Sequence, residues 1–203
     1  DQRIRTAKTG DWWTTNPERA LANNSVAYSD KPDAGIFMKE WLSLYESKSG
    51  ERGIFNRASA QKKAAENGRR ESHWDFGTNP CSEIILRPNQ FCNLTEIVVR
   101  AGDTVTSLTR KIKVATLLGT IQSTFTNFGY LRKVWQDNTE EERLLGVSLT
   151  GIMDSELLNG KETGLAKTLE KLKKVAVDCN KEYAEKFNIN QSTAITCVKP
   201  SGT

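Results

Sequence analysis

The stretch Asn79-Pro80-Cys81-Ser82-Glu83 places an amide, a thiol and a carboxylate within five residues. Pro80 fixes its own φ and disfavours helical backbone at Asn79, so the stretch predicts a stiff loop tip. Cys81 and Glu83 are two positions apart, and on extended backbone their side chains point to the same side. A thiol facing a base favours chemistry, because cysteine does radical or nucleophilic work and glutamate moves protons. The alternative is that Cys81 is a small buried hydrophobe, as most free cysteines are.

Short apolar stretches alternate with amphipathic ones on both sides of this motif. We expect strands at residues 25–28, 53–56, 83–86, 91–99, 144–149 and 194–198, and helices at residues 33–47, 59–66, 105–124 and 161–187. Asp33 and Asp103 are the expected N-caps of the first and third of these helices. The alternation predicts an α/β fold with a largely parallel sheet covered on both faces. Periodicity alone does not distinguish an open sheet from a closed barrel.

Composition indicates an ordinary globular domain. The chain has 203 residues and a formal net charge of +4, with its lysines and arginines spread out rather than clustered. Direct nucleic-acid binding is therefore not expected, because it normally needs a denser basic patch. No apolar run reaches the length of a membrane span and no signal-peptide pattern is present, so we expect a cytoplasmic protein. The chain starts at Asp1 and stops within a turn-like motif, which suggests a single partial catalytic domain, residues 1–203, truncated at both ends.

The sequence around the motif resembles that of a known protein family. Residues 76–88 (FGTNPCSEIILRP) and 91–96 (FCNLTE) together resemble the finger loop of ribonucleotide reductases. These residues are most similar to those of the adenosylcobalamin-dependent ribonucleoside-triphosphate reductases, which form class II. Residues 50–57 (GERGIFNR) and 199–203 (KPSGT) extend the resemblance in the same order along the chain. It implies part of a ten-stranded α/β barrel, with the Cys81 loop inserted through the centre of the barrel.

The resemblance also implies roles for individual residues. Cys81 would carry a thiyl radical, Glu83 would act as general base, and Asn79 would hold the ribose hydroxyls. Cys92, eleven positions after Cys81, would supply one half of the substrate-reducing thiol pair, whose other half lies upstream of Asp1 in the family. The terminal turn would bind the substrate phosphates through Pro200, Ser201, Gly202 and Thr203.

The other two cysteines, Cys179 and Cys197, are expected to be structural, because they lie in an amphipathic helix and an apolar strand. No metal site is expected, because the cysteines lack C-x-x-C spacing and His73 is the only histidine.

The resemblance implies reduction of ribonucleoside triphosphates to deoxyribonucleotides, with adenosylcobalamin as cofactor. It further implies a deoxynucleotide effector, a thioredoxin-type dithiol reductant and a monomeric protein. Two alternatives stay open: the large subunit of a metal-dependent class I ribonucleoside-diphosphate reductase, and a nucleotide-binding domain without chemistry. The gap from Cys81 to Cys92 is similar to that of the cobalamin class. Residues 1–203 alone are not expected to turn over substrate.

Overall fold

The structure is a computed structural model that describes residues 2–22, 24–48, 52–161 and 163–201. Its elements, in chain order, are α1 (Gln2–Arg5), α2 (Trp12–Thr15), η1 (Pro17–Leu21), β1 (Ser25–Tyr28), α3 (Ala34–Ser47), β2 (Gly53–Asn56), α4 (Arg57–Ala65), β3 (Gly77–Thr78), β4 (Ile85–Leu86), β5 (Asn93–Val98), α5 (Val105–Gln122), α6 (Lys133–Glu142), β6 (Leu145–Thr150), η2 (Ile152–Asp154) and α7 (Leu165–Phe187). The predicted mixed α/β class is confirmed. The strands among these residues pair as three two-stranded sheets.

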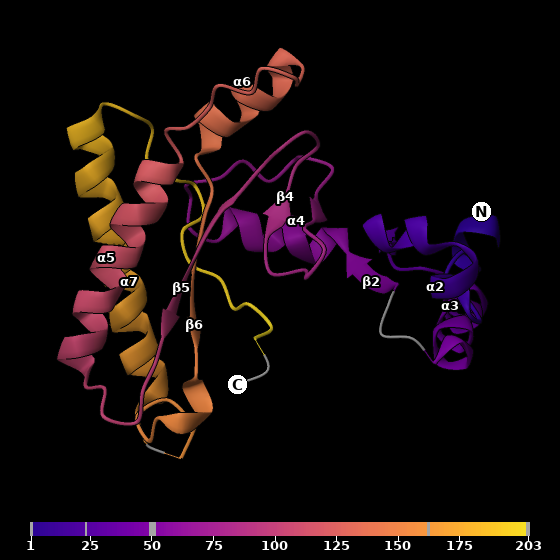
Figure 1. Ribbon diagram of the computed structural model, residues 1–203, viewed down its shortest axis with the longest axis horizontal. Coiled ribbons are helices and arrows are strands. Elements are labelled where there is room, and N and C mark those ends of the chain that lie inside the picture. The colour runs from indigo at the N-terminus through magenta and orange to yellow at the C-terminus, as the bar shows by residue number, and fades with distance from the viewer. Residues whose placement is uncertain (1, 23, 49–51, 162, 202–203) are drawn as a thin grey trace.

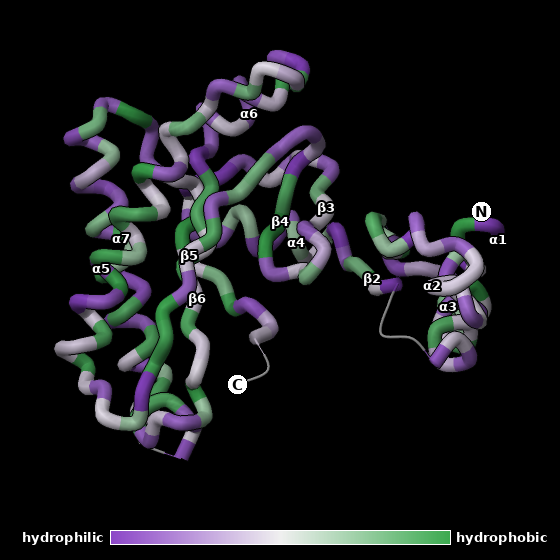
Figure 2. The backbone as a smooth tube through the Cα atoms, viewed as in Figure 1, coloured by the Kyte–Doolittle hydropathy of each residue, from purple (hydrophilic) through white to green (hydrophobic). Residues whose placement is uncertain are grey.

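The main lobe is built on the parallel pair of β5 and β6, whose register runs from Asn93 opposite Leu145 to Val98 opposite Thr150. Helices α5 and α7 pack against each other and lie together on one side of the two strands (Figure 1). Hydrophobic and hydrophilic segments alternate along both helices, as expected of helices with one buried side (Figure 2). The helices therefore cover one face of the pair.

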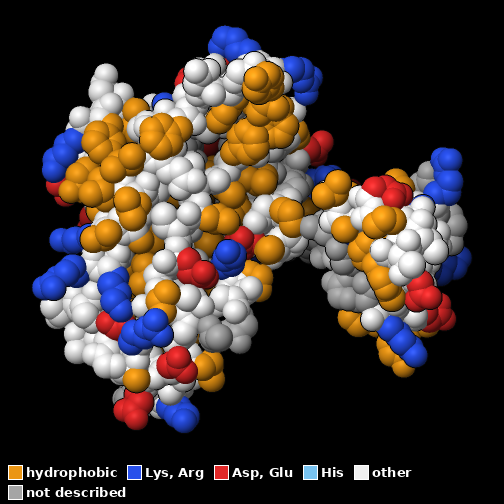
Figure 3. Space-filling model, viewed as in Figure 1, with side chains coloured by type: hydrophobic (Ala, Val, Ile, Leu, Met, Phe, Trp, Pro, Cys, Tyr) orange, Lys and Arg blue, Asp and Glu red, His pale blue; other side chains and the backbone are white. Residues whose placement is uncertain are grey.

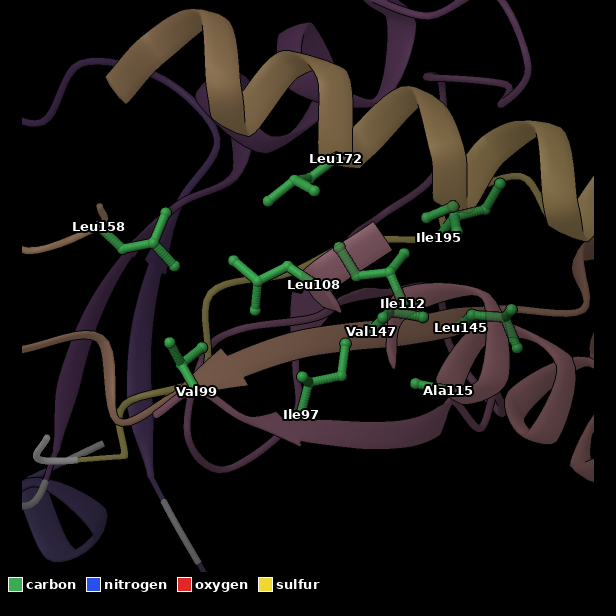
Figure 4. Packing of buried hydrophobic residues seen from close by; sticks show 11 residues of the cluster. Ile97, Val99, Leu108, Ile112, Ala115, Leu145, Val147, Leu158, Leu172 and Ile195 are labelled. Carbon is green, nitrogen blue, oxygen red and sulfur yellow. The ribbon is translucent and has the colours of Figure 1, made fainter. Parts of the chain in front are cut away.

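The core lies between these helices and the strands. Eleven buried side chains form it, and Figure 4 shows strand residues such as Val147 facing helix residues such as Leu108 and Leu172. Leu108 and Leu145 are fully buried. Burying each large apolar side chain contributes roughly 1.5–3 kcal/mol, so this cluster is the main source of stability in the lobe. Alternate residues of β6, such as Gly146 and Ser148, face away from the helices.

Residues 194–198 run beside β6 but form a single parallel bridge, Val147 with Thr196, rather than the expected full strand. The Leu145 N–H donates to the Ala194 carbonyl at 3.0 Å, and the Val147 N–H donates to the Ile195 carbonyl at 2.8 Å. β6 thus advances two residues while its neighbour advances one. That mismatch shifts the register, which explains why the ladder is not regular.

The N-terminal lobe contains α1, α2, η1 and α3 and is joined to the main lobe through β2 and α4 (Figures 1 and 3). β1 and β2 pair in parallel from Ser25 opposite Gly53 to Tyr28 opposite Asn56, as the two predicted strands require. Asp33 caps α3, since its side chain accepts from the Gly35 and Ile36 N–H groups at 2.9 and 3.1 Å. Residues 1–33 were expected to be irregular apart from one strand, and they contain three short helical turns as well.

Helix α5 begins at Val105 as expected, but its N-cap is Thr104 rather than Asp103. Thr104 and Ser107 form a reciprocal capping box. The Asp103 carboxylate instead accepts from the Lys111 ammonium at 2.5 Å, the Ser107 hydroxyl at 2.7 Å and the Arg100 N–H at 2.8 Å. These bonds, that of Lys111 first, lower the pKa of Asp103 to about 2.

Candidate active site

The motif Asn79-Pro80-Cys81-Ser82-Glu83 lies in a hairpin loop framed by the antiparallel strands β3 and β4, which pair Gly77 with Leu86 and Thr78 with Ile85. The expected strand at residues 83–86 is therefore shorter, and its partner precedes the loop instead of following it. We call residues 79–84 the finger loop. Its position on a short hairpin confirms the prediction of a loop tip.

Asn79 organises this loop. Its side-chain Oδ1 accepts from the Ile84 N–H at 3.0 Å, and its carbonyl accepts from the Ser82 N–H at 3.0 Å. Ser82 adopts a left-handed φ of 64°, an uncommon conformation for a residue with a Cβ. The loop is consequently a tight turn closed by the Asn79 amide.

Cys81 and Glu83 differ in burial within this turn. Cys81 is exposed at the tip, whereas Glu83 is half-buried and turned inward. The extended backbone on which the prediction of a shared side rests is not present, because Ser82 between the two residues has a left-handed φ. Both Glu83 carboxylate oxygens are buried, and neither has a hydrogen-bond partner among the described residues.

Glu83 lies near two other thiols. Cys92 directly precedes β5, and burial followed by the nearby Glu83 charge raises the pKa of its thiol. Burial, Glu83 and then Cys92 raise the pKa of Cys197 to about 11. Both sulfurs are therefore held as thiols at neutral pH, and a thiol that donates a hydrogen atom must be in this form.

Gly146 leaves the space in which the finger loop meets the sheet. A Cβ at this position would lie 2.8 Å from the Ile84 Cδ1 atom and 3.2 Å from the Cys197 sulfur. The glycine thus permits the finger loop, β5 and residues 194–198 to converge on one face of β6. This face is opposite the α5 and α7 helices.

The predicted phosphate loop follows the same face. Ser148 is buried on β6, and its hydroxyl accepts from the Lys199 N–H at 3.1 Å. Pro200 is exposed and Ser201 is half-buried. Gly202 and Thr203 lie outside the described residues. Ser148 therefore fixes the point at which the chain leaves β6 and enters the loop.

No family model matches the chain. An adenosylcobalamin-dependent ribonucleoside-triphosphate reductase of Lacticaseibacillus paracasei is 29% identical over 213 residues, covering 91% of this chain and 28% of the relative. The reductase of the same name from Lactobacillus gasseri is 32% identical over 152 residues, covering 63% of this chain and 20% of the relative. The chain thus spans about a quarter of the length of these relatives.

The fold agrees with a solved structure described as a B12-dependent (class II) ribonucleotide reductase. The TM-score is 0.62 at 23% identity, covering 100% of this chain and 31% of that one. The chain is similar to class II ribonucleotide reductases. The resemblance that the sequence predicted is confirmed, and the finger loop lies in the part of the fold shared with that reductase.

The finger hairpin of this reductase-like fold is held in place by a buried polar network. The Arg70 guanidinium donates to the two Glu142 carboxylate oxygens at 3.0 and 2.8 Å and to the Ile85 carbonyl at 2.7 Å. It also donates to the Gln90 Oε1 atom at 3.1 Å. Because Ile85 belongs to β4 and Glu142 ends α6, the network ties the hairpin to the main lobe.

Cys197 was predicted to be a structural cysteine, and its position near the finger loop was not predicted. The sulfur lies on the finger-loop face, where a Cβ at Gly146 would approach it to 3.2 Å, and Glu83 and Cys92 are among the causes of its raised pKa. One signal was present in the sequence: Cys197 lies two residues before the predicted phosphate loop. The carboxyl ends of parallel strands are where α/β folds collect their ligand-binding residues. Cys179, by contrast, is buried beside the Lys113 carbonyl on α5, as expected of a structural cysteine.

Two absences complete the description. Within the ranges given above, no helix combines the length and apolarity needed to cross a lipid bilayer. Over the same residues, no three histidine, cysteine, aspartate or glutamate side chains are grouped so as to hold a metal ion.

Proposed function

We propose that the protein reduces ribonucleoside triphosphates to 2′-deoxyribonucleoside triphosphates by a thiyl-radical mechanism, with this chain supplying part of its catalytic domain. The observation that carries the proposal is the finger hairpin itself, with an exposed Cys81 at its tip and the buried, unpartnered Glu83 carboxylate facing inward. The relatives named adenosylcobalamin-dependent ribonucleoside-triphosphate reductases support the reaction class.

The overall reaction is balanced by a dithiol. A ribonucleoside triphosphate and two thiols give the deoxynucleotide, a disulfide and water. The radical on Cys81 takes the hydrogen atom from the 3′-carbon of the ribose, and Glu83 accepts the proton of the 3′-hydroxyl. The 2′-oxygen then leaves as water with a proton from the reducing thiol pair, and Cys81 returns the hydrogen atom to the 3′-carbon once that pair has formed its disulfide. Cys92 supplies one reducing equivalent, consistent with the raised pKa that keeps it protonated.

Asn79 has a restricted part in this scheme. Its Oδ1 is already engaged by the Ile84 N–H, so its contribution to the substrate is donation from Nδ2. The phosphates would bind at Pro200, Ser201, Gly202 and Thr203, beyond the Ser148 anchor. The finger loop would thus bind the ribose hydroxyls and the terminal turn would bind the phosphates, both on the same face of β6.

Adenosylcobalamin is the cofactor that this proposal requires. When bound, it supplies an organic radical that removes a hydrogen atom from a thiol. Cys81 fits that requirement, because its side chain is exposed at the tip of the finger loop. The described residues of this chain contribute the thiol.

The proposal includes the finer architecture and the partners. In a ten-stranded α/β barrel the pairs β1–β2 and β5–β6 would belong to opposite halves, with the finger loop between them. A deoxynucleotide effector and a thioredoxin-type dithiol would act on a monomeric protein. The cytoplasm, where thiols stay reduced, is the expected compartment.

The test uses the full-length protein with a ribonucleoside triphosphate, adenosylcobalamin and a dithiol. Deoxynucleotide should form, and electron paramagnetic resonance should detect a cofactor-dependent radical signal. Cys81→Ser should abolish both, whereas Cys179→Ser should preserve them. Undiminished turnover in Cys81→Ser would overturn the mechanism, and turnover of diphosphates without cobalamin would favour the class I alternative.

A further inference from the structure

A cavity of about 310 Å³ lies on the inner side of the finger hairpin. Its walls come from α4 and the turn after it, from Glu83 and the start of β4, and from residues 193–198 beside β6. Arg69, Arg70 and Glu83 are among its charged side chains. The cavity therefore contains the carboxylate to which the proposed function assigns proton transfer, together with two guanidinium groups.

The two neighbouring arginines differ in what they bind. Arg70 is fully engaged: its side chain is 4% exposed and bonds to Glu142, Gln90 and the Ile85 carbonyl. Arg69 is half-buried, and its Nε is buried without a hydrogen-bond partner among the described residues. Nor does it form an ion pair with any residue that the structure describes. The described part of the fold therefore provides partners for Arg70 but none for Arg69.

Glu83 lines the same cavity and also lacks a partner among the described residues. Both of its oxygens are buried and lack a partner within the described ranges, and it does not pair with Arg69. Burial of a carboxylate without a partner is unfavourable, so a partner supplied by a ligand would stabilise it. A cavity lined by this carboxylate and by a guanidinium whose Nε has no partner among the described residues suits a ligand that carries both hydroxyl donors and an anionic group.

We propose that Arg69 binds a phosphate group of the nucleotide whose ribose hydroxyls face Glu83. The inference rests on the proposed function and adds a substrate-binding residue to it. A guanidinium suits this role, because its planar fork donates two parallel hydrogen bonds to phosphate oxygens. The position is also suitable, because residues 193–198 line the cavity and lead directly into Lys199, Pro200 and Ser201.

The experiment measures ligand binding by the full-length Arg69→Gln variant. One ligand is a ribonucleoside triphosphate and the other is the same nucleoside without phosphates. Affinity for the triphosphate should fall about tenfold to hundredfold, the loss expected for one charge-assisted contact. Affinity for the nucleoside should not change, and Arg69→Lys should lose less than Arg69→Gln because it keeps the charge. Arg110→Gln, which removes an exposed arginine from α5, is the matched control and should bind both ligands normally.

Unchanged triphosphate affinity in Arg69→Gln would overturn the inference, as would an equal loss for nucleoside and triphosphate. The Arg69→Lys variant keeps the test available if the glutamine variant does not fold. Failure of the proposed function gives a different result: the wild-type protein would bind triphosphate through Arg69 without producing deoxynucleotide.

Discussion

Arg70→Met removes the centre of the buried network that anchors the finger hairpin. The variant loses four hydrogen bonds, two to Glu142 and one each to Gln90 and the Ile85 carbonyl. It leaves the Glu142 carboxylate, whose side chain is 4% exposed, with Gln90 as its remaining side-chain partner in the network. An uncompensated buried charge of this kind costs about 3–5 kcal/mol. We expect a loss of unfolding free energy in that range.

The double variant Arg70→Met/Glu142→Leu separates the charge from the packing. The double variant also removes the unpaired carboxylate. Its free energy of unfolding should therefore exceed that of Arg70→Met by at least about 2 kcal/mol. Lys174→Ala breaks the ion pair with Asp178, whose side chains are 74% and 60% exposed, and serves as the surface control. That variant should lose less than about 0.5 kcal/mol.

Equilibrium urea unfolding of the full-length proteins, followed by circular dichroism, measures all three changes. The slope against urea must stay constant for the comparison of free energies to hold. A loss below about 1 kcal/mol in Arg70→Met would refute the argument that the network is a buried ionic anchor. So would a double variant no more stable than the single one.

Three further predictions concern the strand ends and the loop they carry. Gly151→Ala should cost more than about 2 kcal/mol, because the position has a φ of +72° and its Cβ would lie 2.6 Å from a backbone carbonyl. Gly68→Ala, at a φ of +61° with open space around it, should cost only about 1 kcal/mol, and urea unfolding measures both changes. The lowered pKa of Asp103 means that its carboxylate stabilises the fold fully above about pH 4 and loses this effect as the pH falls to about 2. The melting temperature of the wild type should therefore fall over this range, and in Asp103→Asn it should fall less. Ser148→Ala should raise the KM for triphosphate several-fold with kcat unchanged, since the hydroxyl fixes the start of the phosphate loop. Ser155→Ala, at a buried hydroxyl without a hydrogen-bond partner in the described chain, should change neither constant.

The sequence predicted best where local signals and burial agree. Helix α3 starts at its expected Asp33 cap, and α5 and α7 show the apolar period that packs them on β5 and β6. The parallel strand pairs were likewise visible as short apolar runs between helices. Such segments carry their structure in their own spacing, so a single chain is enough to find them.

Elements held by polar contacts were not found. Helix α6 has buried Thr139 and Glu142 in place of an apolar stripe, and its end is fixed by Arg70 from a distant part of the chain. The hairpin of β3 and β4 is only two residues long on each side, too short for a period to be read. The register shift at residues 194–198 depends on pairing with β6, which no local pattern encodes.

The candidate site likewise contains features that local sequence predicts and features that depend on tertiary structure. The finger-loop residues were found because their spacing along the chain is distinctive. Their relative orientation was not, because it depends on the φ of Ser82, a serine to which no propensity assigns left-handed backbone. Cys197 and Arg69 line the candidate site only because of tertiary contacts. The sequence around Cys197 suggests the interior of a strand, and the sequence around Arg69 suggests a solvated pair of basic residues.

The double engagement of Asn79 limits what a substitution there can teach. One amide closes the turn through the Ile84 N–H, and the same amide is proposed to donate to a ribose hydroxyl. A slower Asn79 variant would therefore mix two defects, a displaced sulfur and a lost ligand contact, in a single rate. Kinetic roles for the motif are better apportioned at Cys81 and Glu83, whose side chains the backbone of the loop does not use.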